Sequence, residues 1–411
     1  MTRKRPLRPR SKRRTRAIAA ALLALCGLVS TGCGGGSPAS GDAEPSIRSV
    51  PLSAQAALGE LIFNDASLSA SGRQSCSSCH DPAQAHASPN TLPAQMGGAA
   101  LEFQGGRNAP SIRYLADNRA FRFEADGTPT GGFFWDGRAA SLQAQAGKPL
   151  LNPLEMANAN EAEVVARLSK ARYAAQFQQL FGADIFDQPE AAFARLTLAL
   201  QAYQLEDPAF RPYSSKYDAF LRGSAVLSSA EQRGLALFNS PAKGNCAACH
   251  PSARSADGSL PLFTDFSYDN LGVPRNTALR QNADPGSFDL GLCARPDGSL
   301  ASRSDLCGAF KVPSLRNVAL RGAYFHNGRF NSLREVLQFY VQRDTRPERW
   351  YPLRADGTAD KFNDLPPAWR NNVNTQEAPY NRRIGQPPAL DEAEIDELLA
   401  FLLTLSDGYR P

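Results

Sequence analysis

The feature that most constrains this chain is a pair of thiols followed directly by an imidazole. The pattern occurs twice, in "QSCSSCHDP" and "GNCAACHPS", and its members are Cys76, Cys79, His80, Cys246, Cys249 and His250. A zinc site would need four Cys or His ligands in one place, and a redox dithiol would need no adjacent histidine. Attachment of a c-type haem explains the spacing, because two thiols add to the vinyl groups and the next imidazole reaches the iron. The sequence therefore predicts two c-type haems.

The first 33 residues have the pattern of an export signal. A basic start precedes an apolar run over residues 17–29, which is shorter than the ~20 residues that a membrane-spanning helix needs. Residues 30–33 resemble the end of a bacterial lipoprotein signal, in which Cys33 carries the lipid; plain cleavage is the alternative. We expect a periplasmic protein that a lipid anchors to the membrane, with residues 34–48 as a flexible linker.

The leader also explains the basic composition. Nine of the 45 Lys and Arg residues precede Asp42, and without them 36 basic residues face 40 acidic ones. The pI of about 8.8 therefore gives no reason to expect nucleic acid as a partner.

Two cysteines lie outside the leader and the repeated motifs. Cys293 and Cys307 belong to a polar loop with Gly and Pro, and no further metal-ligand candidates stand near them in the sequence. Because disulfides persist in exported proteins, the pair predicts a disulfide that closes this loop.

An internal repeat divides the chain after the leader into two halves. Residues 52–64 precede the first motif, and residues 227–239 precede the second. Each segment predicts a short helix that a serine caps. Aligning Gly59 with Gly234 also places Ser53 on Ser228, Phe63 on Phe238 and Asn64 on Asn239.

A similar helix is predicted near the C-terminus, over residues 390–405, with Asp391 as its N-cap. Its apolar stripe is expected to pack in the core and consists of Ile395, Leu398, Leu399, Leu402 and Leu405.

Strand signals are scarce, and the connections between the predicted helices are long. Loops of this length are unusual in a compact helical domain unless something else fills its core, and two haems would do so. We therefore predict a mainly α protein of two cytochrome c-like helical domains with long loops, each with one covalently bound c-type haem. The expected domains are residues 49–222 and 223–411.

Few residues are candidates for the iron ligand opposite each motif histidine. The two histidines outside the motifs are His86 and His326, and no methionine follows the second motif. The second iron therefore has His326 or a tyrosine as its local candidates, unless Met96 or Met156 reaches across.

Long ordered stretches of the chain resemble the bacterial di-haem cytochrome c peroxidases and, within that family, its MauG-like group. They include "LGELIFNDASLSASGRQSCSSCHDPAQA", "GGRNAPSI", "FFWDGRAASLQAQAGKPLLNPLEM" and "FKVPSLRNVALRGAYFHNGRFNSLREVLQFY". The resemblance implies a peroxide-reducing haem in the N-terminal domain and an electron-transfer haem in the C-terminal domain.

The resemblance also assigns the sixth ligand of the second haem. The family places a Met, or a Tyr in its MauG-like group, at the position of Tyr340, fourteen residues after His326. His326 would then bond to backbone or to a haem propionate. The alternative is that Tyr340 is an ordinary aromatic residue on an apolar helix face.

The first iron is expected to have an open face. Many family members close it with a histidine before "RNAP", but residues 88–106 contain no histidine, and Met96 is their one soft donor. His86 is the alternative distal group. An open iron is a site for hydrogen peroxide.

The resemblance implies that Gln145, Pro149 and Glu155 line that open face. A carboxylate there can carry a proton from the inner to the outer peroxide oxygen, and an amide can hold the peroxide. Without the resemblance of the surrounding motif, Gln145 and Glu155 would be expected to be ordinary surface residues.

Two further assignments follow from the family. Trp135 matches a tryptophan that relays electrons between the haems, although a buried indole is also an ordinary core residue. Asn108 and the backbone carbonyls of Arg321 and Ala323 match an interdomain calcium site, where the family usually has Thr and Pro at the latter two positions.

The predicted function is the reduction of hydrogen peroxide at the first haem. Both irons would formally reach Fe(IV), the second with the Tyr340 phenolate, and a small cytochrome c or cupredoxin would return the electrons. One alternative is MauG-like oxidation of Trp or Tyr residues in a partner protein. The MauG-like group uses a surface tryptophan two residues before the second motif for this electron transfer, and here that position is Gly244. Trp350 and Trp369 lie elsewhere, and no sequence feature indicates that they contact a partner. A non-catalytic electron-transfer or sensor protein is the alternative of another class.

Overall fold

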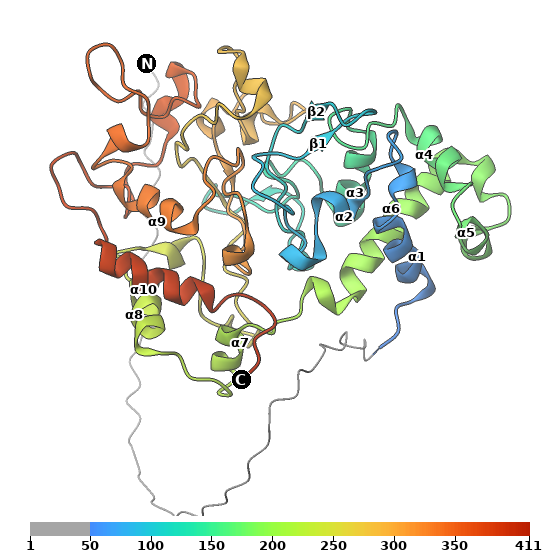
Figure 1. The fold of residues 1–411 in the computed structure, drawn as a ribbon, viewed down its shortest axis with the longest axis horizontal. Helices are drawn as coiled ribbons and strands as arrows, with labels where there is room; N and C mark the ends of the chain where they lie inside the picture. Colours follow the sequence, from blue (N-terminus) through green and yellow to red (C-terminus); the bar gives the residue numbers. More distant parts are fainter. Residues whose placement is uncertain (1–49) are drawn as a thin grey trace, which may run out of the picture. The chain divides into compact units, whose positions relative to one another are not determined.

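The fold is built from helices joined by long loops (Figure 1). The computed structural model describes residues 50–411, so the predicted export signal, Cys33 and the 34–48 linker lie outside the described residues. In the described part, no helix is long and apolar enough to cross a membrane. Its α-helices are α1 (Ala54–Phe63), α2 (Cys76–Cys79), α3 (Leu142–Leu151), α4 (Glu161–Leu168), α5 (Ala174–Phe181), α6 (Pro189–Glu206), α7 (Lys216–Leu221), α8 (Ser229–Asn239), α9 (Leu333–Gln342) and α10 (Glu392–Leu403).

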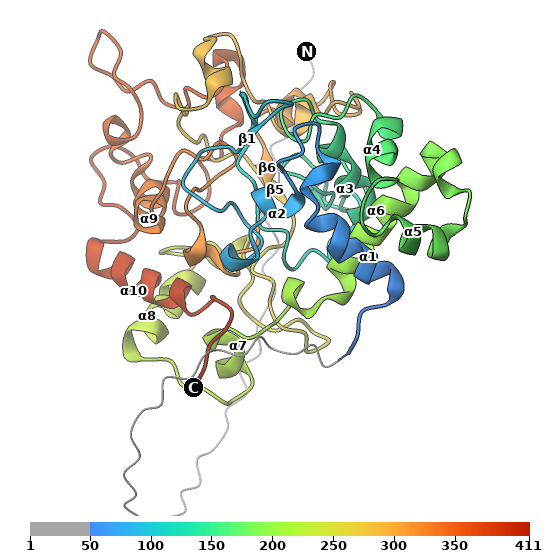
Figure 2. The same cartoon turned by 45° about the vertical axis from the view of Figure 1, so that its right-hand side comes forward.

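Strands are short, as the sequence predicts. Three antiparallel pairs of two-residue strands occur among the described residues, and Figure 2 shows β5 and β6 among the long loops. The pairs are β1 (Met96–Gly97) with β2 (Phe103–Gln104), β3 (Arg122–Phe123) with β4 (Pro129–Thr130), and β5 (Tyr268–Asp269) with β6 (Phe310–Lys311). The mainly helical fold class is confirmed.

The predicted helix starts are confirmed at atomic level. The Ser53 hydroxyl accepts a hydrogen bond from the Ala56 N–H at the start of α1, and the Ser228 hydroxyl accepts one from the Glu231 N–H at the start of α8. Asp391 caps α10 in the same way, through the Glu394 N–H. These side chains satisfy backbone donors that have no partner within the helix.

The aligned glycines mark two equivalent helix crossings. α1 packs against α6, and α8 packs against α10 (Figure 1). A Cβ atom on Gly59 would overlap the Ala199 carbonyl of α6, and a Cβ atom on Gly234 would overlap the Glu397 carbonyl of α10. The internal repeat therefore reflects two close backbone contacts that only glycine permits.

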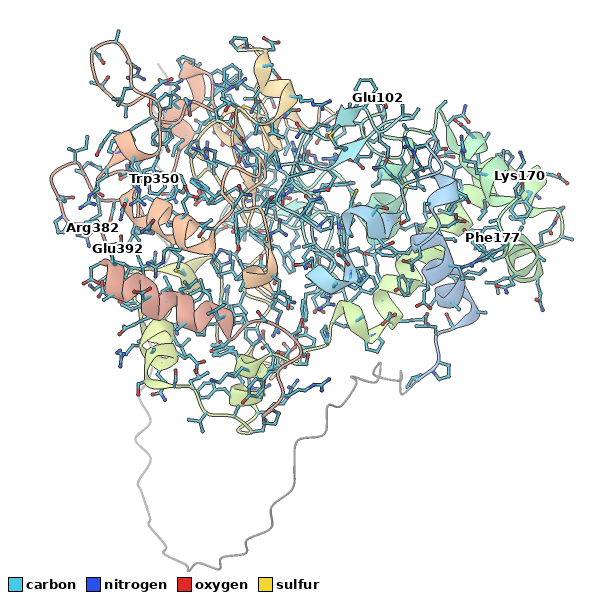
Figure 3. All side chains as sticks on the ribbon, viewed as in Figure 1. Glu102, Lys170, Phe177, Trp350, Arg382 and Glu392 are labelled. Atoms are coloured by element: carbon cyan, nitrogen blue, oxygen red, sulfur yellow. A yellow bond between two sulfur atoms is a disulfide. The ribbon has the colours of Figure 1, made fainter. Side chains whose placement is uncertain are left out.

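Each crossing carries its own buried cluster. Phe63, Phe177 and Leu196 belong to the first cluster, and Phe238, Trp350 and Phe401 belong to the second. Figure 3 labels Phe177 and Trp350, which lie in the two halves. Residues 50–411 nevertheless belong to one compact unit, so the predicted boundary between residues 222 and 223 stays a prediction.

Backbone hydrogen bonds between loops join the two halves. The Gly131 N–H donates to the Phe266 carbonyl (2.9 Å), and the Lys311 N–H donates to the Trp135 carbonyl (2.8 Å). These bonds tie the loop around Trp135 to residues of the second half, so Trp135 lies where the halves meet.

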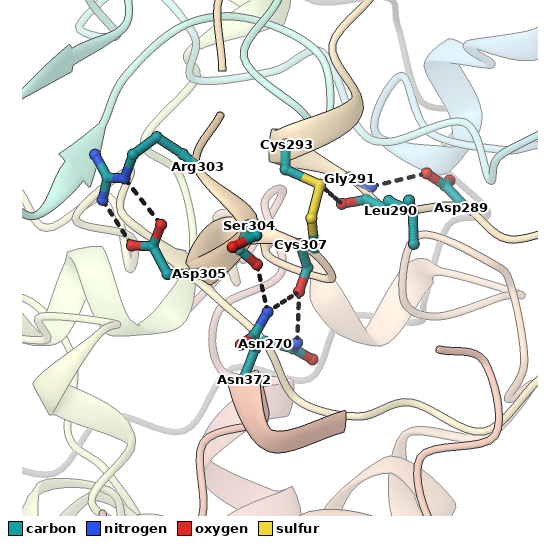
Figure 4. The surroundings of a disulfide bond; sticks show 10 residues. All are labelled: Asn270, Asp289, Leu290, Gly291, Cys293, Arg303, Ser304, Asp305, Cys307 and Asn372. Carbon is teal, nitrogen blue, oxygen red and sulfur yellow. Dashed lines mark hydrogen bonds and ion pairs between the residues drawn. A yellow bond between two sulfur atoms is a disulfide. The ribbon is translucent and has the colours of Figure 1, made fainter. Parts of the chain in front are cut away.

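The predicted disulfide is present. Cys293 and Cys307 are bonded, with a sequence separation of 14 residues (Figure 4). The Cys307 carbonyl accepts hydrogen bonds from the side-chain amides of Asn270 (3.1 Å) and Asn372 (3.2 Å). The disulfide loop is thereby fastened to two other segments of the second half.

The crossings generate a prediction for stability. Gly59→Ala and Gly234→Ala should each lower the free energy of unfolding by about 1–3 kcal/mol, the usual cost of overpacking, because the added methyl group meets a backbone carbonyl. Urea unfolding of the haem-loaded protein would measure this change. Gly286→Ala is the matched control, because the nearest atom to its added methyl group is 3.4 Å away. Equal stability of all three variants would contradict the packing argument.

Candidate haem sites

One large cavity contains residues of both motifs. Its volume is about 610 Å³, and its walls come from both halves of the chain. Phe63 of α1 and Phe238 of α8 are part of this wall, so the helix crossings shape it. Every predicted site residue except Ala323 lines the cavity: Cys76, Cys79, His80, Asn108, Trp135, Gln145, Pro149, Glu155, Cys246, Cys249, His250, Arg321 and Tyr340.

The two motif histidines are buried, and a backbone carbonyl lies beside the Nδ1 atom of each. His80 Nδ1 lies 3.3 Å from the His86 carbonyl, and His250 Nδ1 lies 2.7 Å from the Phe263 carbonyl. A carbonyl that accepts a hydrogen bond from Nδ1–H favours the tautomer in which Nε2 has a lone pair for a metal. Burial lowers the pKa of His80 to about 4 and also lowers the pKa of His250. Both imidazoles therefore fit an iron ligand.

The motif cysteines lie in a buried, apolar setting. Burial raises the pKa of Cys76, Cys79 and Cys246 to about 12, so these thiols are protonated. In the described part of the chain none of the four motif thiols takes part in a disulfide, unlike Cys293 and Cys307. Two thiols beside an oriented imidazole, repeated at two places in a mostly apolar cavity, fit two c-type haems.

The three residues predicted beside the first iron come together. Helix α3, which the Ser141 hydroxyl caps, carries Gln145 and Pro149, and the chain after α3 brings Glu155 to the same cavity. The Asn152 side-chain amide donates to Glu155 Oε1 (2.8 Å).

Glu155 is a buried carboxyl group close to the first motif. Burial raises the pKa of Glu155, although the Arg138 charge and the Asn152 hydrogen bond oppose the rise. The Glu155 charge is also one cause of the raised pKa of Cys79. A carboxyl group with a raised pKa in a cavity can exchange protons with a bound molecule.

His86 belongs to the core and does not line the cavity. Its ring centroid lies 4.3 Å from that of Phe210, and its Nδ1 accepts a hydrogen bond from Arg113 Nε (3.1 Å). Burial, and next the Arg113 charge, lower the pKa of His86 to about 3. The geometry therefore gives no support to His86 as a distal group, whereas Met96 does line the cavity.

Tyr340 lies on the cavity wall of the second half. Helix α9 carries it, and its ring stacks on Phe325 with centroids 5.9 Å apart. Burial raises the pKa of Tyr340, and the neighbouring Cys246 and Cys249 raise it further. Tyr340 is therefore close to the second motif.

His326, the other candidate ligand, has a different setting. Its ring stacks on Phe310 with centroids 3.5 Å apart, and its Nε2 lies 3.8 Å from Asp364 Oδ2. Nε2 is buried without a hydrogen-bond partner in the described residues. Both candidates line the cavity, but Tyr340 is the one that Cys246 and Cys249 influence.

The indole ring of Trp135 is held by a buried hydrogen bond. Its indole Nε1–H donates to the Asn108 carbonyl (2.8 Å). Sequence reasoning missed the ionic network beside it, in which Arg107 contacts both Asp136 and Asp289 at 2.6 Å. Arg107 and Asp136 were detectable as neighbours of Asn108 and Trp135 in "GGRNAPSI" and "FFWDGR", whereas Asp289 has no such signal.

The residues expected to bind calcium do not fit a calcium ion. The Arg321 guanidinium donates to Asn108 Oδ1 through Nη2 and to the Ala323 carbonyl through Nε (3.3 Å). Burial lowers the pKa of Arg321 to about 10, so the group is a cation at neutral pH. The side chain of one expected ligand residue thus donates to oxygen atoms of the other two, and this arrangement gives no support to the predicted calcium site.

Comparison with known proteins identifies the family. A family model described as di-haem cytochrome c peroxidase matches residues 53–226. The methylamine utilization protein MauG of Paracoccus denitrificans (strain Pd 1222) is 38% identical over 384 residues, which cover 91% of this chain and 94% of that protein. The chain belongs to the di-haem cytochrome c peroxidase and MauG family. Membership implies two haem c groups, in agreement with the two motifs.

Other relatives support the same assignment. Cytochrome c551 peroxidase of Nitrosomonas europaea is 32% identical over 287 residues, 69% of this chain and 71% of that protein. The crystal structure of the diheme peroxidase BthA from Burkholderia thailandensis E264 matches with a TM-score of 0.79 and 41% identity, and covers 87% of each chain. The predicted resemblance is confirmed.

The placement of Tyr340 and His326 generates a prediction for the second haem. Tyr340→Met should raise its reduction potential by a few hundred millivolts, within the roughly 0.8 V that axial ligands span, because a strongly donating phenolate is lost. His326→Ala should keep the low-spin signal of this haem. Potentiometric titration and EPR of both variants check the assignment. If His326→Ala removes that signal and Tyr340→Met preserves it, His326 is the ligand.

Proposed function

We propose that this chain is an exported di-haem peroxidase that reduces hydrogen peroxide in the first half of the chain. In this proposal Cys76, Cys79 and His80 hold the first haem, and Cys246, Cys249, His250 and Tyr340 hold the second. The observation that carries the proposal is the buried carboxyl group of Glu155, which lines the cavity near Cys79 together with Gln145.

The haem iron supplies a redox-active Lewis acid to which one peroxide oxygen can bind. Glu155 takes the proton of that inner oxygen and delivers it to the outer oxygen, so that water and not hydroxide leaves. The Gln145 amide donates a hydrogen bond that holds the peroxide in line. Over the whole reaction one peroxide, two electrons and two protons give two water molecules.

Pro149 and Asn152 position these groups. Pro149 lies inside α3 one turn after Gln145, and it lines the cavity without a polar group of its own. The Asn152 amide holds Glu155 Oε1. Its hydrogen bond favours the carboxylate, and this form is the one that can accept the first proton.

Trp135 and Tyr340 have roles in electron transfer in this proposal. The indole of Trp135 is fixed on the Asn108 carbonyl at the boundary of the two halves, so it can relay electrons between them. Tyr340 would supply the second haem with an anionic phenolate donor, and such a donor would favour a high oxidation state there. Peroxide chemistry and charge storage are thus divided between the halves.

An external donor returns the electrons, and we propose a small cytochrome c or cupredoxin. The alternative, oxidation of Trp or Tyr residues in a partner protein, has support from the 38% identity to MauG. Gly244, at the position of the exit tryptophan of MauG, is buried and carries no side chain that could be oxidised. Peroxide reduction is therefore the preferred function. A non-catalytic electron-transfer or sensor role would leave Glu155 and Gln145 without a purpose.

The cellular location is also a proposal. The basic leader, the apolar run and Cys33 support export to the periplasm and a lipid anchor. Attachment of c-type haems outside the cytoplasm agrees with this location.

Replacing Glu155 tests the proposed function. Glu155→Gln should slow peroxide activation by about 10²-fold or more while the haem content stays normal. A reaction that needs the carboxylate is lost as the pH falls through its pKa, and burial moves that loss to a higher pH than for an exposed Glu. Stopped-flow mixing with peroxide across pH measures both effects. Glu190→Gln, at an exposed position, is the control. Wild-type rates in Glu155→Gln would show that another residue moves the proton.

A second prediction concerns activation. Because His86 is bound in the core, no histidine among the described residues of this region can close the first iron. Resting ferric protein should therefore give one high-spin and one low-spin EPR signal and consume peroxide without prior reduction. Two low-spin signals and inactivity before partial reduction would argue for a sixth ligand, with Met96 the first residue to replace.

A further inference from the structure

Asn108 is a junction between the two halves, and all of its polar groups are engaged. Its backbone N–H donates to the His326 carbonyl (2.7 Å), and its backbone carbonyl accepts from the Trp135 indole (2.8 Å). Its side-chain amide donates to the Pro93 carbonyl (3.2 Å), while its Oδ1 accepts from Arg321. The orientation of Asn108 therefore fixes the indole on one side and the His326 segment on the other.

The Arg321 guanidinium occupies the centre of this junction. Besides Asn108 Oδ1, it donates to the Ala323 carbonyl and to the Ala109 carbonyl, both at 3.3 Å. The residue comes from the second half of the chain, and two of these oxygen atoms belong to Asn108 and Ala109 in the first half. Calcium would need such oxygens at 2.3–2.6 Å around itself, and the planar guanidinium already takes their hydrogen-bonding capacity.

Among residues 50–411 the charge of Arg321 has no carboxylate partner. Its three acceptors are neutral, and the described part of the chain offers it no carboxylate. A buried cation without compensation is costly. Arg321 also lines the cavity, and each haem that binds there would bring two propionate carboxylates. The Arg321 cation thus lies on the wall of the cavity in which the negatively charged propionates would bind.

We propose that the Arg321 guanidinium takes the place of a metal ion between the two halves. It supplies a fixed positive charge beside the haems, and it positions Trp135 through Asn108. The chain is therefore independent of calcium. The inference rests on the proposed two-haem function, but not on peroxide chemistry or on the identity of the electron donor.

The first test is the metal content and metal response of the haem-loaded protein. After desalting, elemental analysis should find calcium far below one ion per chain. Treatment with EGTA, and then with excess calcium chloride, should leave both haem potentials and the thermal unfolding midpoint unchanged. One calcium ion per chain, or a shift of a haem potential in EGTA, would overturn the proposal. Neither readout involves peroxide, so failure here is distinct from failure of the proposed peroxidase function.

The second test removes the charge. Arg321→Met keeps much of the side-chain volume but cannot be a cation, so the ferric state should be favoured and at least one haem potential should fall. Arg321→Lys keeps a cation and should restore most of that shift. Arg383→Met, at an exposed arginine, is the matched control and should leave both potentials unchanged. Wild-type potentials in correctly folded, haem-loaded Arg321→Met would refute the role of the guanidinium.

Discussion

The close approach of two helix backbones in each half is the constraint on which the rest of the structure depends. Gly59 lets α1 rest on the Ala199 carbonyl, and Gly234 lets α8 rest on the Glu397 carbonyl. Each of these helices ends near a phenylalanine that forms part of the cavity wall, Phe63 or Phe238. Because each motif follows its helix after a short connection, the crossing also fixes where the thiols and the imidazole enter the cavity. A wider crossing would displace wall and ligands together.

The same crossing supports different chemistry in the two halves. In the first half, α3 and the turn after it bring an amide and a carboxyl group to the cavity, whereas in the second half α9 brings a phenol. The positions of the imidazoles are equivalent, since a backbone carbonyl orients each one. In the proposed function, the groups that differ between the halves would account for the division between peroxide chemistry and charge storage. The repeated helix crossings would position both haems alike, and the residues that differ would assign their roles.

Sequence reasoning succeeded where local rules decide the structure. The serine caps, the Asp391 cap and the Cys293–Cys307 disulfide depend on neighbours in the chain. It did not single out α6, although this helix is the partner of α1. α6 packs against α1, α3 and α4, but its buried side includes Thr197 and Gln204, and its exposed side includes Ala194, so its apolar pattern is weak in the sequence. Arg321 shows a second limit. Its backbone position matched the family, but the path of its long side chain to Asn108 depends on a segment 213 residues away.

Two groups on the cavity wall lack partners that a bound haem could provide. His326 Nε2 has no hydrogen bond among the described residues, and the Arg321 charge has no carboxylate there. An unsatisfied buried polar group costs about 1–3 kcal/mol and a charge costs more, which is a large part of the 5–15 kcal/mol by which a typical domain is stable. The propionates of a haem are groups that would satisfy an imidazole N–H and a guanidinium. The features that suit the cavity for its haems therefore make the haem-free chain unstable, and folding should be coupled to haem attachment.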